Sequence, residues 1–291
     1  MKFRFVLAAA IALMPVLSAS AQETVSRPPA KPIRASKIVL VGDSTTAVQG
    51  GWGPSFCAQH ATSFLACVNL ARGGRSSYNY RAEGSWEIAL HEMRKGPYES
   101  IYVLVQFGHN DQPGKPGRST DLATEFPENL RRYVREIRAA GAQPVLVTPL
   151  TRRQFAGGKL LHDLEPWAEA TRKVAVELDV PLVDLYARSQ ALVQGMGPVL
   201  AMRTAQRPPA PEQVSAARNG TTIGMPAQQG AQPGATAQAS VQSNAAVEPM
   251  GQAKLAFDYT HVGPEGADLF AAIVADELAR AVPSLRGQLI P

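Results

Sequence analysis

A serine follows directly on an apolar run near the start of the chain. Residues 38–41 are Ile-Val-Leu-Val, and Gly42, Asp43 and Ser44 come next. In open parallel sheets, ligands bind where strands end at their carboxyl edge, so Ser44 is a candidate nucleophile at such an edge. The same three residues also suit an ordinary turn or helix cap, and that alternative stays open on this stretch alone.

An aspartate and a histidine near the other end of the chain could activate such a serine. Asp258 and His261 are three residues apart, a spacing that lets a turn bring the carboxylate against the imidazole ring. A carboxylate that accepts from one ring nitrogen leaves the other nitrogen free to take the serine proton. The alternative is a capping aspartate beside a surface histidine.

Apolar runs that alternate with amphipathic segments must position these side chains. Five runs predict strands, at residues 37–41, 64–70, 101–107, 144–148 and 180–184. Apolar spacings of three and four predict helices near residues 54–61, 85–94, 126–137, 164–178, 185–193 and 268–282. Strands that alternate with helices predict a five-stranded parallel sheet covered on both faces, a three-layer α/β/α sandwich.

The first residues predict an export signal. Lys2 and Arg4 precede the apolar stretch 5–17, and small residues at 19–21 suit a signal peptidase, so residues 1–21 are expected to be removed. The protein is then periplasmic or extracellular. The apolar stretch is too short to span a bilayer comfortably, so no stable membrane insertion is expected. Residues 22–36 form a Pro-rich leader.

A single domain is expected over residues 37–202 and 254–286, interrupted by a low-complexity insertion at 203–253. The insertion is rich in Ala, Gln, Pro, Gly and Ser, and no aromatic residue occurs between Tyr186 and Phe257. Such a segment buries too little apolar surface to offset its ordering entropy, so it is predicted to be disordered. A flexible lid or a wall-binding tether is the alternative.

Composition narrows the partners and cofactors. The chain carries 29 basic and 24 acidic residues, and the basic ones are scattered, which argues against nucleic-acid binding. Five histidines without a metal-binding spacing predict neither a metal nor another cofactor. Cys57 and Cys67, in an exported protein, are candidates for a disulfide, with two buried thiols as the alternative.

Four short blocks taken together resemble the SGNH or GDSL hydrolase superfamily. In chain order they are Gly42-Asp43-Ser44, Asn69 through Gly74, Gly108-His109-Asn110-Asp111 and Asp258-Tyr259-Thr260-His261. Within this superfamily, the sequence of these blocks is most similar to that of the rhamnogalacturonan acetylesterases. The similarity rests on Gly74-Arg75-Ser76, on Phe107 before the third block, and on Val147-Thr148-Pro149-Leu150-Thr151-Arg152-Arg153. The resemblance covers about residues 37–188 and 255–283, and it implies the flavodoxin-like SGNH hydrolase fold.

The resemblance implies a role for each candidate. Ser44 is the nucleophile, His261 the general base and Asp258 its orienting carboxylate. The amides of Ser44 and Gly74 and the side chain of Asn110 form the oxyanion hole, where a lost donor costs about 3 kcal/mol in the barrier. An amide aimed at a reacting atom favours a glycine, which lacks a Cβ. A structural glycine and an Asx-turn are the alternatives at Gly74 and Asn110.

Polar residues in the candidate loops indicate a polar substrate. Arg75, His109, Arg152 and Arg153 are candidate substrate-binding residues, and guanidinium groups suit planar carboxylates. The resemblance implies an acetylated, uronate-containing pectic chain such as rhamnogalacturonan. Alternatively, Arg152 and Arg153 belong to a salt-bridged or solvated loop, and His109 is a structural residue of the site wall.

The predicted function is that of an exported serine esterase that deacetylates a carbohydrate ester through an acyl-enzyme intermediate. Two other classes stay open. One is a different SGNH esterase, such as a lysophospholipase, a thioesterase or a xylan or oligosaccharide acetylesterase. The other is a non-catalytic glycan-binding relative.

Overall fold

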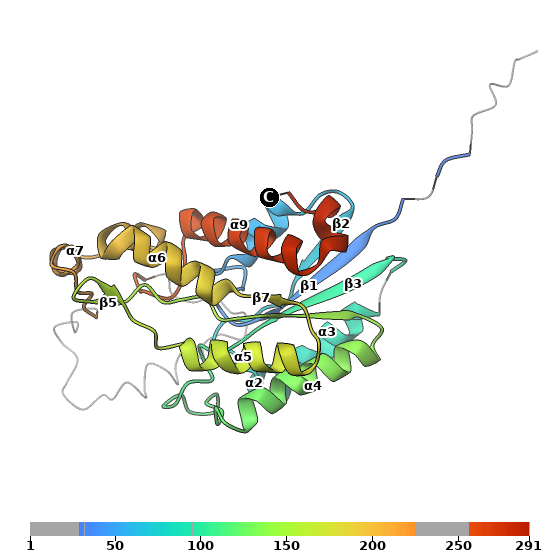
Figure 1. The fold of residues 1–291 in the computed structure, drawn as a ribbon, viewed down its shortest axis with the longest axis horizontal. Helices are drawn as coiled ribbons and strands as arrows, with labels where there is room; N and C mark the ends of the chain where they lie inside the picture. The colour runs from blue at the N-terminus through green and yellow to red at the C-terminus, as the bar shows by residue number, and fades with distance from the viewer. Residues whose placement is uncertain (1–28, 32, 95, 225–255, 291) are drawn as a thin grey trace, which may run out of the picture. The chain divides into compact units, whose positions relative to one another are not determined.

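The computed structural model describes residues 29–31, 33–94, 96–224 and 256–290 (Figure 1). The chain divides into two compact units, Met1–Ile33 and Arg34–Pro291, and the second holds the sheet and the helices. The predicted signal peptide, residues 22–28 of the predicted leader and residues 225–253 of the predicted insertion lie outside the described residues. Within the described ranges, no helix combines the length and the apolar character needed to cross a membrane.

A five-stranded sheet forms the centre of the second unit, in the order β2-β1-β3-β4-β7 (Figure 1). Its strands are β1 Ser36–Gly42, β2 Leu65–Asn69, β3 Ser100–Gln106, β4 Gln143–Val147 and β7 Leu182–Val183. Every pair is parallel, and Leu40 of β1 lies opposite both Asn69 and Leu104. The carboxyl ends of the strands therefore meet at one edge, and the predicted five-stranded parallel sheet is confirmed.

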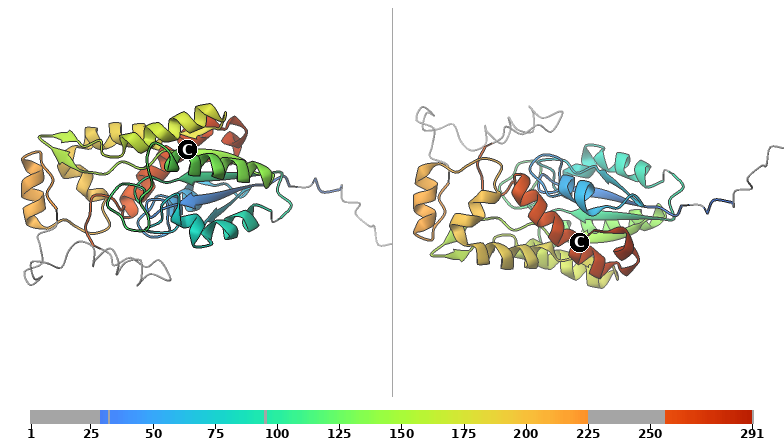
Figure 2. Two further views of the ribbon diagram at one scale, coloured as in Figure 1. Left: turned by 90° about the horizontal axis from the view of Figure 1, so that it is seen from below. Right: turned by 90° about the horizontal axis from the view of Figure 1, so that it is seen from above.

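Helices cover both faces of this sheet, as Figure 2 shows. Successive residues of β1 point to opposite faces: Ile38 and Leu40 join one core, and Val39 and Val41 join the other. The first core is covered by α1 Gly53–Ser55, η1 Phe56–His60, α6 Leu185–Ala201, α9 Pro264–Ala281 and η3 Pro283–Gln288. The second is covered by α2 Asn79–Ala82, α3 Ser85–Met93, α4 Glu125–Ala139 and α5 Glu165–Glu177. The predicted three-layer sandwich is confirmed.

Two helices differ from their predicted bounds. α6 continues to Ala201, past the predicted end near residue 193, with a break at Gly197, whose φ is 69°. α9 begins at Pro264, four residues before the predicted start, because proline with its fixed φ suits the first turn of a helix. Both extensions lead toward the segment that was predicted to lack structure.

The predicted disorder of residues 203–253 is wrong for residues 203–224. These residues form η2 Met202–Thr204 and α7 Pro211–Arg218, followed by residues up to Gly224. Ala217 of α7 packs in a small cluster with Met202, Phe257 and Tyr259. The two aromatic rings belong to residues that follow the low-complexity stretch. Residues 203–224 can therefore bury apolar surface against them, which the composition of the stretch alone does not indicate.

A short antiparallel hairpin also supports this region, and the sequence did not predict it. Its strands are β5 Phe155–Ala156 and β6 Lys159–Leu160. The amide of Phe155 donates to Thr222 Oγ1 at 2.8 Å, and the amide of Gly158 donates to the carbonyl of Gly220 at 2.8 Å. The hairpin and the residues after α7 therefore hold each other.

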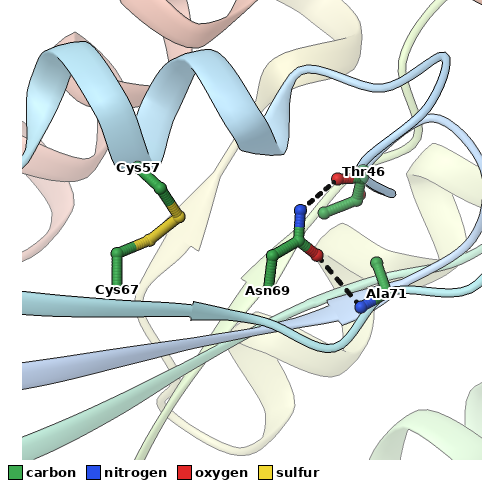
Figure 3. Close-up of a disulfide and its surroundings, with 5 residues drawn as sticks. All are labelled: Thr46, Cys57, Cys67, Asn69 and Ala71. Carbon is green, nitrogen blue, oxygen red and sulfur yellow. Dashed lines mark hydrogen bonds between the residues drawn. A yellow bond between two sulfur atoms is a disulfide. The ribbon is translucent and has the colours of Figure 1, made fainter.

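A disulfide joins Cys57 in η1 to Cys67 in β2, as the sequence predicts (Figure 3). Their Cα atoms are 5.4 Å apart. A bridge that closes so short a loop stabilises the fold by about 3 kcal/mol in the chain-entropy model. It fixes η1 against β2 two residues before Asn69, where the strand ends.

Candidate active site

Ser44 lies in a tight turn that begins directly after β1. The carboxylate of Asp43 is fully buried, and its Oδ1 accepts from both the amide and the hydroxyl of Thr45 at 2.8 Å. The amides of Thr46 and Ala47 donate to the carbonyl of Asp43 at 3.2 and 3.0 Å. The buried carboxylate thus closes the turn, and Ser44 stays half-buried at its surface.

Gln106, at the end of β3, holds the same turn from the neighbouring strand. Its side chain is buried, and its Oε1 accepts from Trp52 Nε1 at 3.0 Å and from the hydroxyl of Thr46. Its Nε2 donates to the carbonyl of Thr148 at 3.3 Å. Sequence reasoning missed this residue, although an amide inside the apolar run 101–107 was an available signal.

Asn69 holds the turn from the other neighbouring strand, β2. Its Nδ2 donates to the carbonyl of Thr46 at 2.9 Å, and its Oδ1 accepts from the amide of Ala71 at 3.0 Å (Figure 3). The side chain of Asn69 also lies close to the backbone of Gly53. A Cβ on Gly53 would lie only 2.4 Å from Asn69 Nδ2. The turn that carries Ser44 is therefore fixed from both strands beside β1.

Asp258 and His261 face each other in the turn before α9. Asp258 Oδ2 lies 2.6 Å from His261 Nδ1, and Oδ1 accepts from the amides of Thr260 at 2.7 Å and His261 at 2.6 Å. Burial alone would raise the pKa of Asp258, but the hydrogen bond and charge of the imidazole and the two amides outweigh it and leave that pKa below its usual value. An ionised carboxylate at Nδ1 leaves Nε2 free to accept a proton.

The Asp-His turn packs against the loop that carries Ser44. The amide of Val262 donates to the carbonyl of Gly50 at 2.9 Å. A Cβ on Gly50 would lie 3.1 to 3.2 Å from the side chain of His261, and Gly50 has a φ of +87°. Glycine therefore fits here both in conformation and in space, and it lets the imidazole dock six residues after the serine.

Gly74 and Asn110, the other two predicted oxyanion donors, lie on adjacent loops. Gly74 has a φ of +73°, which glycine adopts without strain. Asn110 Nδ2 donates at 3.0 Å to the carbonyl of Arg75, the residue that follows Gly74. The amide of Arg72 donates to the carbonyl of Gly42 at 2.9 Å and so ties this loop to the end of β1. A side-chain amide has two N–H donors, and this bond uses one.

His109 lies beneath the site, and the prediction that it binds substrate is wrong. Its side chain is 3% exposed, and its Nδ1 lies 3.4 Å from Oδ2 of the fully buried Asp43. Burial lowers the pKa of His109 by more than the carboxylate raises it. Burial raises the pKa of Asp43, but His109 and the bonds from Thr45 lower it further. Burial therefore disfavours the charged form of the ring, whereas the contacts of Asp43 favour its ionised form.

Arg153 also lies out of reach of a substrate, so its predicted role in substrate binding is wrong. It is fully buried, because its side chain turns inward beneath the Asp-His turn. The guanidinium donates to the carbonyls of Asp258 and Thr260, both at 3.2 Å, and of His261 at 2.7 Å. Burial lowers the pKa of Arg153 to about 10, so the group remains charged at neutral pH.

Arg75 and Arg152 are nearer the surface and have local partners. Arg75 Nε donates to both carboxylate oxygens of Glu83 at 3.0 and 2.9 Å. Arg152 pairs with Asp163, and its Nε donates to Thr260 Oγ1 at 3.2 Å. The pairing of Arg152 agrees with the salt-bridged alternative, and the part of Arg75 and Arg152 in substrate binding stays a prediction.

A cavity of about 390 Å³ opens beside the Asp-His turn. Arg152, Asp258 and Thr260 line it together with Gln154, Gln213 and Phe257. Gln213 belongs to α7, so the helix that the sequence did not predict forms part of a hollow at the candidate site. In the part of the chain that the structure describes, no group of three or more His, Cys, Asp or Glu side chains could hold a metal ion.

The chain is similar in sequence to known proteins. The model of the GDSL-like lipase/acylhydrolase family matches residues 40–202. Rhamnogalacturonan acetylesterase RhgT of Bacillus subtilis (strain 168) is 36% identical over 176 residues, which cover 58% of this chain and 71% of the relative. The probable rhamnogalacturonan acetylesterase YesY of the same organism is 34% identical over 170 residues, covering 56% and 76%.

Two solved structures share the fold. YxiM from Bacillus subtilis superimposes with a TM-score of 0.56 at 22% identity, covering 86% of this chain and 58% of that chain. Axe2, an acetylxylan esterase from Geobacillus stearothermophilus, gives a TM-score of 0.50 at 16% identity, covering 86% and 95%. At these identities the likeness is one of fold.

Proposed function

This chain belongs to the GDSL-like lipase/acylhydrolase family, and we propose that it is an exported esterase that removes acetyl groups from a carbohydrate. The proposed substrate is an acetylated pectic polysaccharide such as rhamnogalacturonan. The observation that carries the catalytic part is the 2.6 Å contact between Asp258 and His261, in a turn docked on the loop of Ser44. The names of two relatives about one-third identical support the substrate.

In the proposed reaction, Ser44 Oγ attacks the carbonyl carbon of the acetyl group while His261 Nε2 accepts the hydroxyl proton. Asp258 holds the Nδ1–H and stabilises the imidazolium that forms. The negative charge on the carbonyl oxygen is met by the amides of Ser44 and Gly74 and by Asn110 Nδ2. The tetrahedral intermediate then collapses, the sugar oxygen leaves with the proton from His261, and the acetyl group remains on Ser44.

Water completes the cycle. His261 Nε2 takes a proton from a water molecule, whose oxygen attacks the acetyl carbonyl of the acyl-enzyme. The second tetrahedral intermediate uses the same donors, and its collapse returns the proton to Ser44 Oγ and releases acetate. The half-exposed imidazole suits this step, because it must reach both the serine and a solvent molecule.

Acetate release from a panel of polymers tests the proposal. The panel contains acetylated rhamnogalacturonan, acetylated homogalacturonan, acetylated xylan and a long-chain acyl ester, each incubated with the wild type and with Ser44→Ala. We expect the fastest release from rhamnogalacturonan and none with the variant. A preference for xylan or for the long-chain ester would assign another esterase activity, and polysaccharide binding without release would assign a glycan-binding protein.

The proposed export has its own test. Cleavage after Ala21 would leave Gln22 as the first residue of the mature protein. Expression of the full chain with a periplasmic fractionation step and N-terminal sequencing measures this directly. Cell-associated protein that retains Met1 would contradict export.

A further inference from the structure

One arginine takes up every main-chain carbonyl of the turn from Asp258 to His261. The guanidinium of Arg153 accounts for the carbonyls of Asp258, Thr260 and His261, at 3.2, 3.2 and 2.7 Å. Its own amide donates to the carbonyl of the remaining residue, Tyr259, at 2.9 Å. Arg153 is separated from this turn by more than a hundred residues of chain, so the contact is a purely tertiary one.

These bonds orient the peptide groups that hold the carboxylate of Asp258. The carbonyls of Tyr259 and Thr260 point to Arg153, so the N–H groups on the opposite side of the same two peptides point away from it. Those N–H groups belong to Thr260 and His261, and both donate to Asp258 Oδ1. The other carboxylate oxygen, Oδ2, contacts the imidazole. A continuous chain of hydrogen bonds therefore runs from Arg153 through two peptides to the ring of His261.

The cost of this arrangement indicates a purpose beyond filling space. Arg153 is fully buried, and its Nε has no hydrogen-bond partner in the described part of the chain. Removing a guanidinium from water is costly, and an apolar side chain would fill the same space without that cost. Charge-assisted bonds to three carbonyls return part of it and fix the turn more firmly than neutral bonds would.

We propose that Arg153 is a positioning residue for the catalytic base: it acts through the peptides of the Asp258–His261 turn to hold the carboxylate and the imidazole in their reactive geometry. This inference rests on the proposed Ser-His-Asp mechanism. It does not depend on which polysaccharide is the substrate, and a small acetyl ester is therefore a sufficient probe.

The test compares Arg153→Met and Arg153→Lys with the wild type. Methionine fills space without donors, and lysine keeps the charge but not the planar fork. On 4-nitrophenyl acetate we expect kcat of Arg153→Met to fall about 10²-fold with KM nearly unchanged, because small misplacements of catalytic groups have effects of this size. Arg153→Lys should recover part of that loss.

Arg81→Met supplies a matched control in the other core. Arg81 is also largely buried, and it pairs with Glu136 at 2.7 Å, but it does not contact the Asp-His turn. The additional readout is the downfield NMR signal of the proton between Asp258 and His261, assigned by its absence in His261→Ala. We expect Arg153→Met to shift or broaden this signal and Arg81→Met to leave it in place, even if both lower the melting temperature.

The outcomes separate this inference from the proposed function. Failure of the wild type to hydrolyse the ester would remove the proposed function. An active wild type whose two Arg153 variants keep its kcat and its downfield signal would overturn the role of Arg153 alone. If Arg153→Met does not fold, Arg153→Lys carries the comparison, and if neither folds, Arg153 is a folding residue and the inference is wrong.

Discussion

The molecule contains two aspartate–histidine pairs that differ in their access to solvent. In the pair Asp258 and His261 the side chains are 39% and 29% exposed, and the nearest atoms are 2.6 Å apart. In the pair Asp43 and His109 they are 0% and 3% exposed, and the distance is 3.4 Å. The same two residue types therefore form a hydrogen-bonded pair at the surface and a looser pair below it.

The difference shows that burial decides what such a pair can do. A general base must come within hydrogen-bonding distance of the proton that it takes. The ring of His109 is enclosed and neither of its nitrogens has a hydrogen-bond partner among the described residues. Its carboxylate partner instead closes the turn of Ser44 through Thr45. The exposed pair is accessible for the proposed proton transfer, and the buried pair supports the turn that carries Ser44.

Replacement of the histidine in each pair tests this difference most directly. We expect His261→Ala to lower kcat on a small acetyl ester by on the order of 10⁶-fold, because the serine then has no base. His109→Gln should keep kcat within about tenfold, since its ring is buried away from the surface where a substrate would bind. Steady-state kinetics on both variants measures this. Equal losses would mean that the buried pair takes part in the chemistry.

Replacement of the aspartate in each pair is expected to affect activity in one pair and stability in the other. Asp258→Asn should lower kcat by about 10⁴-fold, because an amide no longer fixes the imidazole tautomer or stabilises the imidazolium. Asp43→Asn retains an acceptor for Thr45 and should instead lower the free energy of unfolding by about 1 to 3 kcal/mol. Kinetics and urea unfolding on the same preparations separate the two effects, and a stable Asp43→Asn protein with a 10⁴-fold loss would contradict them.

The next residue after His109 extends the comparison within one loop. Asn110 is bonded to the loop of Gly74, and one of its N–H groups remains for the oxyanion. Asn110→Ala should lower kcat by about 10² to 10³-fold at nearly constant KM, the effect expected of one oxyanion donor. His109→Gln serves as the neighbouring control. Should Asn110→Ala raise KM without changing kcat, Asn110 would bind substrate and not the transition state.

Sequence patterns were sufficient for the sheet and for the residues at its edge. Parallel strands bring their carboxyl ends to one edge of the sheet, so Ser44 after β1 and Asn110 after β3 were expected at the same edge once the strands were assigned. The Asp258 and His261 spacing is local, and a three-residue turn is enough to form the pair. These parts of the candidate site depend on the parallel direction of the strands and on short spacings, which the sequence indicates, whereas the strand order came from the structure.

The orientation of Arg153 and His109 could not be predicted in the same way. Each belongs to a polar loop, where side-chain direction follows no simple period, and each partner is remote: Arg153 contacts a turn near residue 260, and His109 contacts Asp43. The folding of α7 likewise depends on packing against Phe257 and Tyr259, which are remote in the sequence. From the sequence alone, a charged or polar residue in a candidate site is interpreted as a ligand-binding group. Only the tertiary contacts show that such a residue is buried.

The smallest expected effect is a pH dependence of stability that belongs to the buried pair. Burial holds the pKa of His109 below its usual value, so below about pH 6.5 the unfolded chain binds a proton that the folded protein does not. The contribution of this one group to the free energy of unfolding should therefore fall as the pH drops from 7.5 to 5.5. His109→Gln should lose that part of the slope, whereas replacement of the exposed His162 by Gln should keep it. Urea unfolding at pH 7.5, 6.5 and 5.5 measures the three slopes. A wild-type slope in His109→Gln would mean that the buried ring does not resist protonation, and the distinction between the two pairs would then rest on geometry alone.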